Sequence, residues 1–135
     1  MRGRIVLAVA LGGAVGAVVR AALTMAFPDA AGGFPWTTFG INVTGSFVLA
    51  VLPVFAAVRR SDVLPPMLGT GVLGGYTTLS AYSEQTRHLL DVGRTGTALA
   101  YAVGTVAACL VAVALADRIS TQSQRTVFDE EEGDL

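Results

Sequence analysis

The 135-residue sequence has little charge, one cysteine, one histidine and no lysine. Charged residues make up 14% of the chain, whereas soluble domains average about 25%. Cys109 has no partner in the chain for a disulfide, and with His88 as the single histidine no cluster of cysteine or histidine ligands for a metal can form. The sequence also has no paired nucleophile and base and no phosphate-binding loop. We therefore expect neither an enzyme nor a nucleic-acid-binding protein.

What the chain does contain is hydrophobic sequence, at 53% of its residues. Four apolar segments cover residues 5–27, 38–58, 63–90 and 96–116. A membrane-spanning helix needs about 20 apolar residues. We predict an all-α integral membrane protein in which residues 1–118 form four transmembrane helices with short, antiparallel connections. Residues 119–135 are predicted to be an acidic, disordered tail.

The arginines predict an orientation. Six of them fall on one side of the four predicted spans: Arg2, Arg4, Arg59, Arg60, Arg118 and Arg125. Arg87 and Arg94 fall on the other side. Because basic residues accumulate in cytoplasmic segments, this bias places both termini inside the cell.

The third apolar segment is interrupted by Gly74, Gly75, Thr77 and Thr78. Non-helical backbone at membrane depth is tolerated only where protein buries it or water reaches it. Carbonyl oxygens exposed by a break in the helix could bind a hard cation, and exposed N–H groups could meet an anion. The alternative is a kink that serves only packing.

Polar side chains in the other segments add candidate sites. Asn42 is costly in a membrane span unless it finds a partner or water, so it either joins helices or lines a polar path. Tyr101, Thr105 and Cys109 are four residues apart and share one helix face. Arg20 near the end of the first span either reaches the headgroups or attracts an anion.

Three motifs in order carry a resemblance to a known family: residues 12–20 (GGAVGAVVR), residues 40–47 (GINVTGSF) and residues 69–78 (GTGVLGGYTT). With this spacing, the chain resembles the small four-helix fluoride channels, the Fluc or CrcB family. The resemblance implies two antiparallel subunits in a dual-topology dimer, with fluoride pores along their interface. It also implies a multi-pass protein of the bacterial plasma membrane, surrounded by membrane lipid, that exports cytoplasmic fluoride passively.

The resemblance assigns roles to individual residues. A structural sodium ion (Na+), which is not transported, would be held by the backbone carbonyls of Gly74 and Thr77. Arg20 would lie at an aqueous vestibule. The fluoride path would be lined by Asn42, Leu79, Ser80, Tyr82, Tyr101, Thr105 and Cys109.

Three positions depart from the family pattern. Leu79 and Tyr82 stand where the family has phenylalanines whose edges line the fluoride path, and Gln85 stands where it has an acid. The pore set of this subunit is therefore incomplete, which favours a heterodimer with a paralogous subunit over a homodimer. A subunit that does not conduct by itself is a further possibility. A small four-helix multidrug exporter is less favoured, because it needs a carboxylate deep in the membrane and Glu84 is the only acid near a span.

Overall fold

The computed structural model describes the backbone of residues 2–133 and the side chains of residues 2–120. Its elements are α1 (Arg2–Ala26), α2 (Trp36–Val51), η1 (Leu52–Val54), α3 (Ala56–Arg59), η2 (Pro66–Leu73), α4 (Gly74–Tyr76), α5 (Leu79–Asp91) and α6 (Thr95–Gly133). Within this described part every regular element is a helix, which confirms the predicted all-α class. Most of the predicted tail, residues 119–135, lies outside the described side chains, and its disorder stays a prediction.

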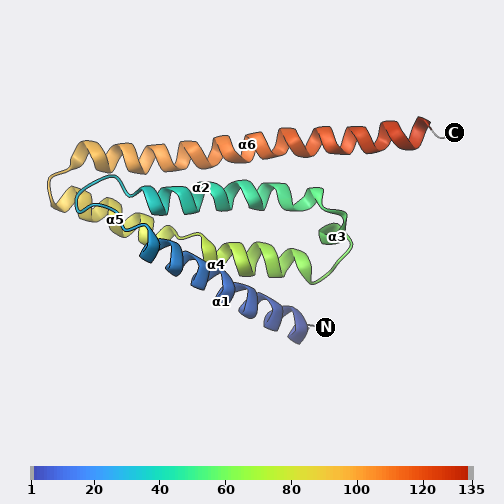
Figure 1. Cartoon of the computed structure of the whole chain (residues 1–135), viewed down its shortest axis with the longest axis horizontal. Helices are drawn as coiled ribbons and strands as arrows, with labels where there is room; N and C mark the ends of the chain where they lie inside the picture. Colours follow the sequence, from blue (N-terminus) through green and yellow to red (C-terminus); the bar gives the residue numbers. More distant parts are fainter. Residues whose placement is uncertain (1, 134–135) are drawn as a thin grey trace.

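The helices run back and forth along one axis (Figure 1). α1 leads from the N-terminus to the opposite end of the molecule, and α2 returns. After α3, the segment made of η2, α4 and α5 runs out again, and α6 comes back. The N-terminus, α3 and the C-terminus therefore share one end, where the sequence places most of the arginines.

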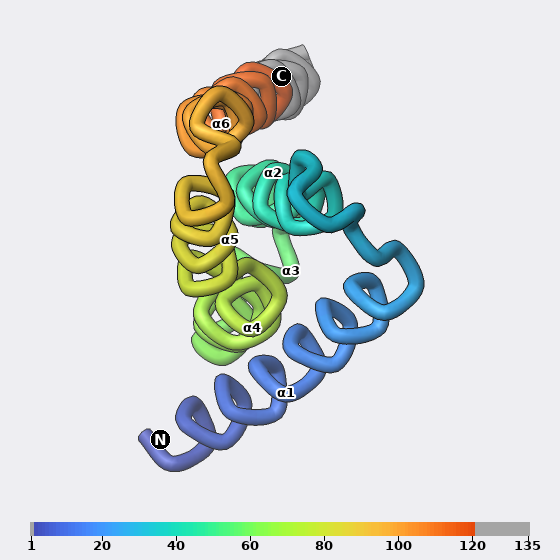
Figure 2. Tube along the Cα trace, turned by 90° about the vertical axis from the view of Figure 1, so that its left-hand side faces the viewer, coloured from blue at the N-terminus to red at the C-terminus, as the bar shows by residue number. Residues whose placement is uncertain are grey.

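Seen along the axis, α1 and α6 lie at opposite edges with the other helices between them (Figure 2). α1 packs mainly against η2 and α4, whereas α6 packs against α2 and α5. The contact with α1 is made by glycines. A Cβ at Gly16 would overlap the carbonyl oxygen of Val72, and one at Gly75 would overlap that of Gly13. The glycines of α1 thus form part of a close packing surface.

Proline and arginine shape the end that carries α3. Pro53 lies in η1, where the chain leaves α2. Proline has no N–H and disrupts the helical bonds around it. Arg59 donates from Nη1 to the carbonyl oxygens of Pro53 and Val54, each at 2.8 Å. The guanidinium therefore satisfies backbone oxygens at the C-terminal end of the α2–η1 segment.

Among the residues that the structure describes, three helices are long and apolar enough to cross a membrane: Arg2–Ala26, Trp36–Val54 and Thr95–Ser120. Their outer side chains are exposed within the chain. Leu11 is 60% exposed, Val103 68% and Leu110 65%. Such a surface is suited to lipid or to another protein chain and not to water.

Candidate functional site

The backbone changes direction between α4 and α5. Thr77 (φ −77°, ψ 159°) and Thr78 (φ −150°, ψ 115°) are extended, and we call these two residues the link. The threonine hydroxyls satisfy backbone groups on both sides. Thr77 donates from Oγ1 to the carbonyl of Leu73 at 2.8 Å. Thr78 is the N-cap of α5, and its Oγ1 accepts a hydrogen bond from the Ala81 amide at 3.1 Å.

Asn42 on α2 fastens the link from the side. Its Oδ1 accepts a hydrogen bond from the Thr78 amide at 2.9 Å, and its Nδ2 donates to the Thr78 carbonyl at 3.2 Å. One amide therefore bonds both backbone groups of a single residue that is 36 positions away in the sequence. The carboxamide has two N–H donors, so one is left over for another acceptor.

A groove of about 490 Å³ runs between α2, the link and α6. It brings together seven of the residues that the sequence singled out: Asn42, Gly74, Thr77, Leu79, Tyr82, Thr105 and Cys109. The remaining wall is mostly aliphatic and includes Leu49, Leu73 and Val113. Of the described residues that line the groove, none carries a formal charge. The surface is thus an apolar channel wall with a few hydroxyl, amide and thiol groups.

Three predicted residues lie outside this groove. Ser80 is exposed, with its hydroxyl 3.1 Å from that of Thr78. Arg20 lines a separate cavity of about 330 Å³, which also reaches Thr78 and Gln85. Tyr101 is fully buried at 0% exposure, so its side chain contributes nothing to the surface of the groove.

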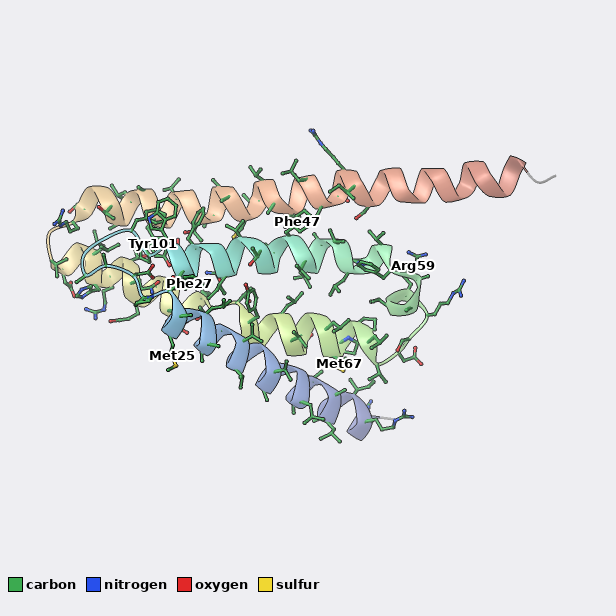
Figure 3. All side chains as sticks on the ribbon, viewed as in Figure 1. Met25, Phe27, Phe47, Arg59, Met67 and Tyr101 are labelled. Carbon is green, nitrogen blue, oxygen red and sulfur yellow. The ribbon has the colours of Figure 1, made fainter. Side chains whose placement is uncertain are left out.

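Tyr101 belongs instead to a polar chain that joins three helices. Its hydroxyl donates to Gln85 Oε1 at 2.8 Å, and Gln85 Nε2 donates to Thr38 Oγ1 at 3.0 Å. Figure 3 shows Tyr101 near one end of the bundle, between α6 and α2, with Arg59 at the opposite end. The ring of Tyr101 lies 5.3 Å from those of Phe34 and Tyr82. This set ties α2, α5 and α6 together beside the groove.

The hydroxyls that face the groove are partly engaged within the chain. Thr105 Oγ1 donates to the Tyr101 carbonyl one turn earlier, at 2.6 Å. Tyr82 donates from its hydroxyl to the Ala102 carbonyl at 2.9 Å. Thr105 and Cys109, which the four-residue spacing puts on one helix face, both line the groove, but the spacing could not indicate that the Thr105 proton bonds to the helix itself.

The carbonyl oxygens predicted to hold sodium fit that role chemically. In an uninterrupted helix the Gly74 carbonyl would accept from the Thr78 amide, which donates to Asn42 instead. The Thr77 carbonyl would accept from the Ala81 amide, which donates to Thr78 Oγ1. Both are neutral oxygen donors of the kind that hard cations prefer.

Comparison with known proteins decides the family. A family model described as "CrcB-like protein, Camphor Resistance (CrcB)" matches residues 7–116. The chain belongs to this CrcB-like family. It is 48% identical over 114 residues to "Fluoride-specific ion channel FluC 1" of Streptomyces coelicolor, an alignment that covers 83% of the chain and 74% of that relative.

Two further relatives carry similar names. "Fluoride-specific ion channel FluC 2" of Nocardia farcinica is 43% identical over 113 residues, which is 82% of this chain and 81% of the relative. "Fluoride-specific ion channel FluC" of Novosphingobium aromaticivorans is 46% identical over 106 residues, or 74% and 82%. The family predicted from the three motifs is therefore confirmed. With its three long apolar helices, this CrcB-like chain is a multi-pass membrane protein with bacterial relatives.

The residues that the motifs missed are those joined by distant contacts. Thr38 is 47 positions from Gln85 in the sequence, and nothing in the local sequence indicated that it is buried, at 4% exposure, or that it accepts a hydrogen bond from Gln85.

The charged side chains of α5 pair with each other. Arg87 donates to Glu84 at 2.7 Å and also pairs with Asp91. All three side chains are exposed, and the pairs leave Glu84 at the surface and outside the groove of this CrcB-like chain.

Proposed function

We propose that this chain forms a fluoride-selective channel through which cytoplasmic fluoride leaves the cell passively across the plasma membrane. The observation that carries the proposal is the groove at the link. It gathers most of the residues expected on a fluoride path, in a chain 48% identical to a fluoride-specific ion channel. The driving force is the gradient of the ion and the membrane potential.

The chemistry of the groove supports the passage of a small anion. Fluoride is strongly hydrated, so a pore must replace its water with closely spaced hydrogen-bond donors. The second N–H of Asn42 and the thiol of Cys109 are candidate donors in the groove, with the Ser80 hydroxyl next to it. The N-terminus of α5 begins there as well, at Leu79, and the partial positive charge of a helix N-terminus attracts anions. Without a fixed charge in the groove, the ion binds without being trapped.

The third crossing of the membrane is proposed to be a broken span. η2 and α4 form its first part, the link interrupts it, and α5 completes it. Together with α1, α2 and α6 this gives four spans with both termini on one side. The extended link is then non-helical backbone at membrane depth, bonded by Asn42 and facing the groove, which satisfies the condition for such backbone.

Two chains are proposed to associate in antiparallel orientation with their grooves facing. The proposal is supported by the open groove and by exposed apolar side chains at its α6 edge, where Val106 is 52% and Leu110 65% exposed. In such a dimer the Gly74 and Thr77 carbonyls of both subunits would hold one structural sodium ion. The positive charge of the bound ion would offset the partial negative charges of these carbonyl oxygens. The ion would also fix the two links relative to each other.

The partner is either a second copy or a paralogous subunit. Leu79 is 76% exposed at the groove and offers no aromatic edge, and the Tyr82 hydroxyl bonds to a helix backbone. A heterodimer whose other subunit supplies phenylalanines accounts for both features. In that arrangement this chain contributes half of each path and conducts weakly by itself.

A multidrug exporter is less well supported. Coupling to protons needs a carboxylate within the membrane, and the described groove has none. Glu84, the acid nearest to a span, lies at the surface in a pair with Arg87.

Fluoride efflux from liposomes tests the proposal. Purified chain, reconstituted alone and with a paralogous subunit, should release fluoride and retain chloride. Full activity of the chain alone would exclude the heterodimer. Activity only with the partner would exclude the homodimer.

A further inference from the structure

At the link, two backbone amides donate to side chains and not to the carbonyl four residues earlier. In a continuous helix each amide bonds to the carbonyl four residues earlier. The last such bond before the link joins the Thr77 amide to the Leu73 carbonyl at 2.9 Å. The next amide, that of Thr78, bonds to Asn42 instead of Gly74.

The second diversion occurs one turn later. The Ala81 amide, whose helical acceptor would be the Thr77 carbonyl, bonds to Thr78 Oγ1 at 3.1 Å. Thr78 is 7% exposed, and its hydroxyl also lies 3.1 Å from that of Ser80. The two amides withdrawn by side chains are thus those that would otherwise bond the Gly74 and Thr77 carbonyls.

We propose that Asn42 and Thr78 are positioning residues for the cation: by diverting the Thr78 and Ala81 amides, they keep the Gly74 and Thr77 carbonyls available to sodium. This inference rests on the proposed sodium site and assigns to Asn42 a role besides lining the fluoride path. Neither side chain is required to touch the ion. Each acts through a backbone amide.

Substitutions at position 78 can separate the shape of the side chain from its role as a hydrogen-bond acceptor. Thr78→Val keeps the size and shape of the side chain but removes the acceptor, which frees the Ala81 amide, and it also removes the contact with the Ser80 hydroxyl. Thr78→Ser keeps the acceptor. Asn42→Ala releases the Thr78 amide toward the Gly74 carbonyl. Thr86→Val is the matched control, because Thr86 Oγ1 bonds only to the Tyr82 carbonyl within α5, at 2.8 Å.

The melting temperature of purified protein in detergent is measured at increasing sodium concentration, with choline as the replacement cation to keep the ionic strength constant. The quantity compared is the sodium concentration that gives half of the sodium-dependent rise in melting temperature. Thr78→Val and Asn42→Ala should each raise this concentration about tenfold, since the net value of a hydrogen bond is of that order. Thr78→Ser and Thr86→Val should stay near the wild type. The melting temperature in choline alone reports any general loss of stability separately.

Two results would overturn the inference in distinguishable ways. If wild type responds to sodium and Thr78→Val responds at the same concentration, the positioning role is wrong while the cation site stands. If wild type shows no sodium response, the cation site fails and the inference fails with it. Fluoride efflux from liposomes reconstituted with the same protein then decides independently whether the channel function survives. Should Asn42→Ala not fold, the Thr78→Val and Thr78→Ser pair still gives the answer.

Discussion

A methyl group at position 74 has room inside the chain. The nearest atom to a Cβ built on Gly74 is the Gly69 carbonyl oxygen at 3.9 Å, an ordinary contact distance. In a helix, alanine is favoured over glycine by about 1 kcal/mol. Gly74→Ala should therefore leave the melting temperature of the isolated chain unchanged or raise it slightly.

The same substitution should impair function if two chains meet at the link. In the proposed dimer the Gly74 carbonyls of both subunits approach one sodium ion, so a methyl group on each subunit would be forced into that junction. Overpacking a close contact costs about 1–3 kcal/mol. We expect the sodium concentration that gives half of the sodium-dependent rise in melting temperature to increase about tenfold and the rate of fluoride efflux to fall by a similar factor, because about 1.4 kcal/mol corresponds to tenfold.

Gly75→Ala is the matched control for packing. A Cβ at Gly75 would overlap the Gly13 carbonyl oxygen on α1, and backbone cannot move aside as a side chain can. This variant should lose about 1–3 kcal/mol of stability with or without sodium. The comparison uses thermal unfolding by circular dichroism in detergent and efflux from liposomes. If Gly74→Ala shows the efflux rate and the sodium response of the wild type, the proposed dimer junction is wrong. If Gly74→Ala melts at a temperature as low as that of Gly75→Ala, the packing argument is wrong.

Three further predictions concern other parts of the molecule. Gln85→Ala leaves the buried Tyr101 hydroxyl without its acceptor, so unfolding should become easier by about 1–3 kcal/mol; a thermal melt equal to the wild type would contradict this. Leu79→Phe adds a ring whose positive edge attracts an anion, and efflux by the chain alone should rise severalfold, whereas no change would mean that this side chain does not limit the path. Arg59→Ala exposes two capped carbonyls and should speed limited proteolysis near α3, and an unchanged cleavage pattern would show that the cap is dispensable.

The sequence predicted the helical class and indicated a candidate region for the site, each for an identifiable physical reason. Long apolar runs form helices in a membrane because no other backbone structure satisfies its own hydrogen bonds there, apart from closed barrels. Adjacent glycines and threonines in such a run indicated an interruption near residues 74–78, and the extended backbone lies at Thr77 and Thr78.

The contacts that position the site could not be read from local patterns. Asn42 was expected to face a pore or to join helices, and its bonds to both backbone groups of Thr78 depend on how α2 lies against the link. Tyr101 shares a helix face with Thr105, yet it is fully buried and bonded to Gln85. Spacing identifies which residues share a face, whereas the neighbouring helix decides how far each side chain is buried.

The most direct test of the proposed function is fluoride efflux from sodium-loaded liposomes that contain this chain, followed with a fluoride-selective electrode. Fluoride is expected to leave faster than from protein-free liposomes, chloride to be retained, and a paralogous subunit to increase the rate. Fluoride release no faster than from empty liposomes, both for the chain alone and with the paralogous subunit, would contradict the proposed function.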